Sequence, residues 1–316
     1  MTHAWMPKSP CGDGCLTEGA PTVAFPRRVL RFTAAIGVIL GAFLTAPLVL
    51  VLRGMPRERL VRLLFAGILR SFGVKLRVLG DERFRAVPGR GALVVNNHIS
   101  WLDIIAVNAV QPMRALAKKE VGTWPVLGLL VRRGGSIFLD RENLRSLPAT
   151  MDELAGAMRG GSLVSVTPEG TTWCGQGSGR FRPATFQAAI DGGVPVRPLA
   201  LRFRLADGRE TTQPAFIGPE SLIASLRRVA ALRGLVLEVH VCPEIAPGRA
   251  ADRRELAALA ESAVQAALGR VQIPAQRRRR VPAATPAAAP ASVAPPAVAT
   301  PAVAPVAPPA PEAVSQ

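Results

Sequence analysis

The longest apolar stretch of the chain runs from Phe32 to Leu52, where all 21 residues are apolar or small. A helix of about 20 such residues is long enough to cross the roughly 30 Å hydrocarbon layer of a membrane. The segment that follows, Arg59 to Leu76, spaces arginines among leucines with helical periodicity, which is typical of an amphipathic helix at a membrane surface. The two patterns predict a two-helix membrane anchor, and leave open whether the first helix spans the membrane or lies in one leaflet.

From about Val74 to Arg270 the pattern changes to short apolar runs that alternate with helical stretches. The strands expected from these runs are Val74–Leu79, Ala92–Asn96, Arg114–Ala117, Ser136–Leu139, Leu163–Thr167, Val196–Phe203 and Leu235–Cys242. The expected helices are Leu102–Val110, Leu127–Arg132, Leu144–Arg159, Pro183–Asp191 and Arg253–Leu268. Strands rich in Val, Ile and Leu that are separated by helices indicate an α/β domain, with a mostly parallel sheet flanked by helices.

These patterns divide the chain into four parts. Residues 1–26 are expected to form a flexible N-terminus, 27–72 the membrane-anchoring helices and 73–272 the α/β domain. The remainder, 273–316, alternates proline with alanine and has almost no large side chains. Because such a segment buries too little apolar surface to offset the entropy of ordering, we expect a disordered tail.

Charge favours a lipid surface over nucleic acid as the partner. The net charge is +17, and the segment from Arg27 to Arg85 holds twelve Lys or Arg against three acids, so about half of the excess flanks the most apolar part of the chain. Basic residues in that position attract anionic phospholipid headgroups. Single-stranded nucleic acid is usually bound with aromatic stacking groups, and aromatic residues are 5% of this chain, with no tyrosine. We therefore expect membrane phospholipids, and no nucleic acid, as partners.

The four cysteines predict no metal site. Cys11, Cys15, Cys174 and Cys242 form no paired CxxC sets and have no histidine at ligand spacing. Cys11 and Cys15 could form a disulfide or bind a metal ion, but two ordinary thiols in a flexible segment are the simpler interpretation.

The stretch NNHISWLDI, Asn96 to Ile104, holds the best candidate for catalytic chemistry. Ser100 and Asp103 match the S-x-x-D form of a helix N-cap, so Asp103 could serve only backbone amides. The same geometry would let Asp103 accept a hydrogen bond from one imidazole nitrogen of His98, which leaves the other nitrogen free to take a proton from a substrate hydroxyl. Of the other histidines, His3 lies in the N-terminus, and His240 lies in a strand pattern that favours a structural role.

Three later segments carry polar residues just after expected strands. GGSIFLDR ends in Arg141, which could bind a phosphate or form a surface ion pair. TPEGTT places Glu169, Gly170 and Thr171 in a tight turn after a strand. VPVRPLALRF, Val194 to Phe203, contains prolines, which favour an edge strand or a bend that faces the substrate.

Taken in order, NHISWLD, GGSIFLDR, TPEGTT and VPVRPLAL resemble the four sequence blocks of the glycerolipid acyltransferase superfamily, most closely bacterial 1-acyl-sn-glycerol-3-phosphate acyltransferases. The resemblance implies transfer of a fatty acyl group from acyl-CoA or acyl-carrier protein to a lysophospholipid hydroxyl, without a metal, a cofactor or an acyl-enzyme. His98 would be the general base and Asp103 its orienting group. Arg141 and the loop of Glu169, Gly170 and Thr171 would hold the glycerol phosphate, and Val194 to Pro198 would help to shape a substrate pocket. It also implies a cell-membrane enzyme whose catalytic domain faces the cytoplasm.

The third block departs from the family pattern, which usually begins with phenylalanine and often reads PEGTR. Here Thr167 and Thr172 take those two places, so a guanidinium group that would suit a phosphate is missing. Lys118, which follows the expected strand, is our first choice to replace it, ahead of Lys119, Arg180 and Arg182. Another lysolipid acceptor, such as lyso-ornithine lipid, stays open as an alternative. A thioesterase that uses His98 to activate water, and a noncatalytic membrane protein, are the further alternatives.

Overall fold

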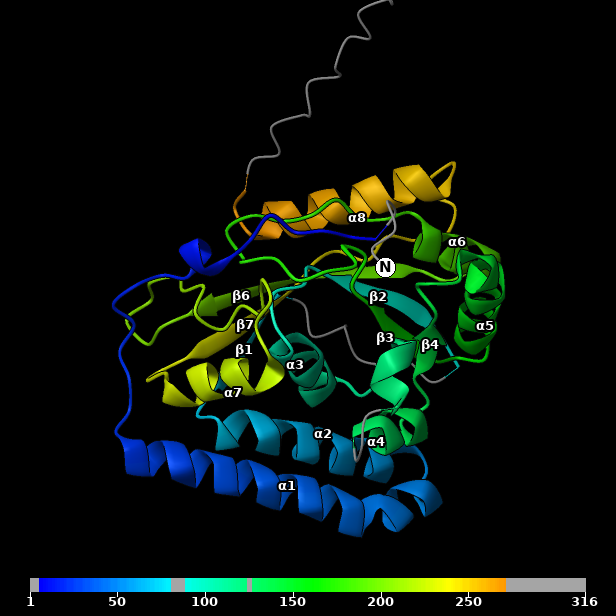
Figure 1. The fold of residues 1–316 in the computed structure, drawn as a ribbon. Helices are drawn as coiled ribbons and strands as arrows, with labels where there is room; N and C mark the ends of the chain where they lie inside the picture. Colours follow the sequence, from blue (N-terminus) through cyan, green and yellow to red (C-terminus); the bar gives the residue numbers. More distant parts are fainter. Residues whose placement is uncertain (1–5, 81–88, 124–126, 271–316) are drawn as a thin grey trace, which may run out of the picture. The chain divides into compact units, whose positions relative to one another are not determined.

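Seven strands form one sheet within the residues that the computed structural model describes, 6–80, 89–123 and 127–270 (Figure 1). They are β1 (Lys75–Gly80), β2 (Ala92–Asn96), β3 (Arg114–Lys118), β4 (Ile137–Leu139), β5 (Leu163–Val166), β6 (Val196–Arg204) and β7 (Val236–Val241). The spatial order is β1-β7-β6-β2-β5-β3-β4, and every neighbouring pair is parallel except the antiparallel pair β6 and β7. The prediction of a mostly parallel sheet is therefore confirmed.

Helices cover both faces of this sheet (Figure 1). They are α1 (Phe25–Val51), α2 (Gly54–Ser71), α3 (Leu102–Val110), α4 (Leu127–Arg133), α5 (Leu147–Arg159), α6 (Ala184–Gly192), α7 (Leu222–Ala231) and α8 (Arg253–Ala267). One buried cluster joins the sheet to α2, α3 and α7, and a second joins its other face to α5, α6 and α8. Side chains of β2 alternate between the clusters, with Ala92 and Val94 in the first and Leu93 and Val95 in the second. This alternation explains why β2 reads as a continuous apolar run.

The expected amphipathic helix Arg59–Leu76 is α2, which begins and ends five residues earlier, at Gly54 and Ser71. Within the α/β domain the expected elements agree with the observed bounds to within a few residues, apart from differences at α5 and α7. A 3₁₀ turn, Leu144–Ser146, precedes α5, so that helix begins at Leu147 rather than at Leu144. The sequence reading missed α7, which follows a long irregular connection. Ser221 caps α7 by accepting a hydrogen bond from the Ala224 amide at 3.2 Å, and this cap is the local signal that could have revealed the helix.

Of the two alternatives expected for the proline-containing strand, an edge strand or a bend that faces the substrate, the edge position is wrong. β6 lies inside the sheet, between β7 and β2. Proline is tolerated there because the missing N–H of Pro198 would face β7 just outside the β6–β7 ladder, which begins at Leu199. The carbonyl of Pro198 still accepts a hydrogen bond from the Cys242 amide.

The N-terminus is packed rather than flexible over residues 6–24, which we name the N-terminal strap. The backbone amide of Val23 donates to the Ala231 carbonyl, and the Arg233 amide donates to the Pro21 carbonyl. Farther along, the Thr17 amide donates to the hydroxyl of Thr212 at 2.7 Å. The strap therefore runs along the domain that forms about 200 residues later in the sequence. The expected disordered tail, 273–316, lies outside the described residues, although a boundary between two units of the chain falls at residue 272.

The first helix is longer than the apolar run that predicts it, and its beginning is fixed to the domain. Arg31 of α1 is buried and donates to the carbonyls of Ala230 and Leu232. Beyond this attachment α1 exposes many large apolar side chains, among them Leu40, Leu44 and Leu48. Among the described residues, α1 is the one helix that is long and apolar enough to cross a membrane. Exposed apolar surface of this extent supports membrane association.

We expect that Leu40→Asp combined with Leu44→Asp lowers partitioning of the protein into anionic liposomes by at least about a hundredfold, because each acid costs about 2.5–3.5 kcal/mol inside a membrane. Liposome cosedimentation measures this partitioning. The control pair is Leu259→Asp with Ile190→Asp, which changes two exposed apolar residues on the helices of the opposite face. Equal partitioning of the two double variants would contradict the assignment of α1 as the membrane-contacting helix.

Candidate active site

Four parallel strands end at one edge of the sheet, and the expected site residues follow those ends. His98 comes two residues after β2, Lys118 is the last residue of β3, and Arg141 comes two residues after β4. Glu169, Gly170 and Thr171 follow β5. Because β4, β3, β5 and β2 are neighbours with the same direction, these residues meet at the carboxyl edge, where α/β proteins commonly bind ligands.

His98 and Asp103 form the pair that their spacing predicts. Imidazole Nδ1 of His98 lies 2.9 Å from Oδ2 of Asp103. The Asp103 side chain is 1% exposed, whereas the His98 side chain is 27% exposed. Since a carboxylate oxygen can only accept, Nδ1 carries the hydrogen, and Nε2 is left as a basic nitrogen on the exposed side of the pair.

The helix cap differs from the expected one. α3 begins at Leu102, one residue later than a cap at Ser100 requires, and the Ser100 hydroxyl lies 3.4 Å from the Leu102 amide. The carboxylate half of the capping box is present, because Oδ2 of Asp103 accepts the amides of Ile99 and Ser100 at 2.7 and 2.8 Å. One oxygen therefore receives three N–H groups, and it both begins the helix and orients His98.

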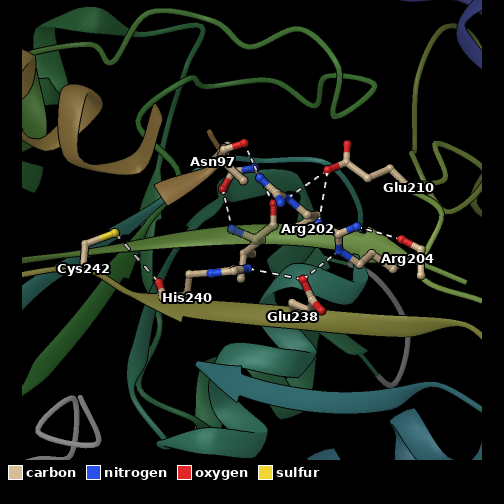
Figure 2. Close-up of polar contacts among 10 residues, drawn as sticks. Asn97, Arg202, Arg204, Glu210, Glu238, His240 and Cys242 are labelled. Carbon is tan, nitrogen blue, oxygen red and sulfur yellow. Dashed lines mark hydrogen bonds and ion pairs between the residues drawn. The ribbon is translucent and has the colours of Figure 1, made fainter. Parts of the chain in front are cut away.

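Asn97 fixes the same loop to β6, a role that the sequence reading missed. Its side-chain oxygen accepts the Leu201 amide at 2.7 Å, and its side-chain nitrogen donates to the Leu201 carbonyl at 3.0 Å (Figure 2). The side-chain amide of Asn97 thus makes the pair of hydrogen bonds to β6 that a further residue of β2 would have made, at the point where β2 has ended. The pair of asparagines before His98 is the sequence signal that could have indicated such a brace.

Glu169 lies behind the catalytic loop and not on its exposed side. It is 3% exposed, and its two oxygens accept the His98 amide at 2.7 Å and the Gly179 amide at 3.1 Å. Burial, together with the charge of Asp103, raises the pKa of Glu169 to about 8, although the hydrogen bonds from these two amides oppose the rise. This geometry favours a positioning role for Glu169 over direct contact with a phosphate.

Arg141 lies within electrostatic reach of two other basic side chains, Lys118 and Arg182, and we name these three residues the cationic cluster. Arg141 donates to the Gly170 carbonyl at 2.7 Å. Desolvation lowers the pKa of Lys118, and the like charge of Arg141 lowers it further, while the charge of Glu120 opposes both. Desolvation also lowers the pKa of Arg141; the charge of Glu120 opposes this, and the charge of Arg182 lowers the pKa further. Cations that are held together against their mutual repulsion suit a phosphate.

The neighbouring Lys119 points to a different partner. Its ammonium group forms an exposed ion pair with Asp140 at 3.0 Å. Lys118 and Lys119 therefore offer a matched comparison, since only Lys118 belongs to the cationic cluster.

Comparison with known proteins gives the family of this chain. A family model described as Acyltransferase matches residues 75–202. Lyso-ornithine lipid O-acyltransferase of Pseudomonas aeruginosa is 35% identical over 71% of this chain and 83% of its own length. 1-Acyl-sn-glycerol-3-phosphate acyltransferase of Neisseria meningitidis serogroup B is 35% identical over 59% of this chain and 72% of its own length.

The chain belongs to the glycerolipid acyltransferase superfamily. Its fold is also that of a solved structure, the 1-acyl-sn-glycerophosphate acyltransferase PlsC from Thermotoga maritima, with a TM-score of 0.60 and 18% identity. The match covers 77% of this chain and 94% of that one. The resemblance and the α/β architecture inferred from sequence agree with these findings.

In this acyltransferase, the threonine that replaces the frequent arginine of the third block faces inward. The Thr172 hydroxyl donates to the carbonyl of Phe216. The Phe216 amide in turn donates to the Ile99 carbonyl at 2.9 Å. Thr172 thus supports the loop of His98, and the cationic cluster is left to supply the charge that the arginine would have brought.

His240 of the acyltransferase is held in a network with Glu238 and Arg204. Its Nε2 lies 3.3 Å from Oε2 of Glu238, which also accepts from Arg204 at 3.1 Å (Figure 2). Glu210 lies within ion-pair distance of Arg202 and Arg204. These side chains brace β6 against β7, as expected for a structural histidine in a strand.

Proposed function

We propose that this acyltransferase moves a fatty acyl group from acyl-CoA or acyl-carrier protein to the free hydroxyl of 1-acyl-sn-glycerol-3-phosphate, which gives phosphatidic acid. The observation that carries the proposal is the basic Nε2 of His98 at the same sheet edge as the cationic cluster. Acylation of a lysophosphatidate needs a base that removes the proton of its hydroxyl and cations that hold its phosphate. Both kinds of group lie at this edge of the sheet.

The chemistry follows from the hydrogen bond between His98 and Asp103. The acceptor hydroxyl donates its proton to Nε2, and its oxygen attacks the carbonyl carbon of the acyl thioester. The C–S bond of the thioester then breaks, and the new C–O bond remains as the ester. His98 gives the proton that it received to the departing sulfur, which leaves as a thiol. Asp103 stabilises the imidazolium that forms between these steps, and no acyl-enzyme is required.

Acyl transfer to lyso-ornithine lipid is the second candidate. It is favoured by the 35% identity to the Pseudomonas aeruginosa enzyme over 83% of that protein, and by Thr172 in place of the frequent arginine. An ornithine headgroup carries one carboxylate and one ammonium group, so it needs fewer cations than a phosphate. The three members of the cationic cluster support the phosphate-bearing acceptor.

Location on the cytoplasmic side of the cell membrane is part of the proposal. Both acyl donors are soluble cytoplasmic molecules, whereas the lysolipid and the product are membrane lipids. A domain held at the membrane by α1 can reach both.

We expect His98→Ala to lower the rate of acyl transfer by at least about a hundredfold, because it removes the general base. Release of free CoA from acyl-CoA, with and without a lysolipid acceptor, measures the rate. His240→Ala, which changes the other described histidine, should retain most of the activity. Near-normal transfer by a folded His98→Ala variant would contradict the mechanism, and acceptor-independent release of CoA by the wild type would indicate a thioesterase.

We expect Lys118→Met to raise KM for 1-acyl-sn-glycerol-3-phosphate about tenfold or more, since a hydrogen bond to a charged group contributes about 1.5–3 kcal/mol. Steady-state kinetics with this acceptor and with lyso-ornithine lipid measure the effect. Lys119→Met makes the same change of charge outside the cationic cluster and should leave KM near the wild-type value. Equal effects of the two variants, or transfer to lyso-ornithine lipid alone, would contradict the choice of a phosphate-bearing acceptor.

A further inference from the structure

Three of the four cysteines meet beside the active site, although Cys174 lies about 160 residues after Cys11 and Cys15 in the sequence. The sulfur atoms of Cys11, Cys15 and Cys174 all lie within 4.8 Å of one another, and all three thiols are free. Cys11 and Cys15 belong to the N-terminal strap, and Cys174 belongs to the loop after β5. The ordinary pair of thiols expected in a flexible segment is therefore a group of three in a packed one.

The backbone around the three sulfur atoms provides hydrogen bonds to them. The Cys174 amide donates to the Cys11 sulfur at 3.3 Å. The amides of Gly177 and Gln176 donate to the sulfur of Cys174, and Gly175 permits this tight turn with a φ of 94°. Amides that converge on sulfur stabilise a thiolate and orient it, as do the outer hydrogen bonds of metal sites.

We propose that Cys11, Cys15 and Cys174 bind one thiophilic metal ion, of which Zn²⁺ is the probe, and that this ion fastens the N-terminal strap to the loop after β5. Thiolate ligands select Zn²⁺ and similar soft ions. At a Zn–S distance of about 2.3 Å, tetrahedral sulfur ligands lie about 3.8 Å apart, so the observed separations need only small shifts. Three protein ligands leave a fourth position for water.

Binding would release protons and would not change the oxidation state of any atom. Each thiol that coordinates loses its S–H hydrogen to solvent as the S–metal bond forms. Affinity should therefore fall as the pH falls, and an oxidant is not needed.

The position of the site indicates what the ion would stabilise. Trp173, the neighbour of Cys174, donates its amide to the His98 carbonyl at 2.8 Å. Three residues earlier in the same loop, Pro7 of the strap packs so closely against Gly170 that an added Cβ would lie 2.7 Å from it. A metal ion at the three cysteines would therefore hold the strap against the part of the loop that contacts His98 and the cationic cluster.

The test uses the full chain in detergent, purified without a polyhistidine tag, reduced, freed of metal with a chelator and then titrated with Zn²⁺ or Co²⁺. We expect one equivalent to bind, with the thiolate-to-Co²⁺ charge-transfer absorption of a sulfur-rich site. Cys11→Ser, Cys15→Ser and Cys174→Ser should each lower the affinity at least about a hundredfold, as loss of a direct ligand exceeds the 10–100-fold effect of an outer partner. Cys242→Ser is the matched control, because Cys242 lies at the end of β7 beside the Ala263 carbonyl.

A second measurement on the wild-type protein does not depend on any variant folding correctly. Zn²⁺ should protect three of the four cysteines from alkylation, and mass spectrometry identifies which ones. Hydrogen exchange in residues 6–24 should slow when the ion binds. The proposal would be overturned if Co²⁺ produced no thiolate charge-transfer absorption, or if Cys242→Ser bound metal no better than the three ligand variants. It would also be overturned if two of the cysteines formed a disulfide and the protein took up no metal after that disulfide was reduced. None of these readouts is activity, so failure here leaves the proposed acyl transfer untouched.

Discussion

One carboxylate oxygen organises the catalytic loop. Oδ2 of Asp103 accepts N–H groups from the His98 ring and from the backbone of Ile99 and Ser100. The two amides begin α3, and the ring contact sets the tautomer of the base. The same buried oxygen therefore determines where the helix starts and which imidazole nitrogen faces the substrate. Removal of this acceptor would leave buried donors without a partner, which costs more than the hydrogen bonds themselves contribute.

The surroundings of this loop keep a second negative charge away from Asp103. Glu169 accepts the His98 amide from behind, and its pKa of about 8 keeps it mostly protonated at neutral pH. A neutral carboxyl group still has lone pairs for both amides that it accepts, so it can position the backbone without competing for the charge of the imidazolium. The two nearby acids thus differ in what they contact: Asp103 accepts from the imidazole ring, and Glu169 accepts only backbone amides.

Local patterns predicted the sheet and the catalytic pair, because their signals lie within a few residues of one another. The run Ala92–Asn96 fixes β2, and four residues separate His98 from Asp103. The features that the sequence reading missed depend on contacts across the fold. Asn97 pairs with Leu201, and Cys11 meets Cys174. Pro198 could not be placed inside the sheet until the start of the β7 ladder was known. The hydrophobic periodicity of one segment cannot predict which residues of a distant segment it will contact.

The tautomer of His98 tests the central claim most directly, namely that Asp103 orients the base. Nitrogen NMR of histidine-labelled protein resolves three histidines, and His240→Gln assists their assignment. At a pH where His98 is neutral, the account predicts hydrogen on Nδ1 and a basic, unprotonated Nε2. A neutral His98 with its hydrogen on Nε2 would contradict it, because such a ring could not donate to Asp103 and could not accept the proton of the acceptor hydroxyl.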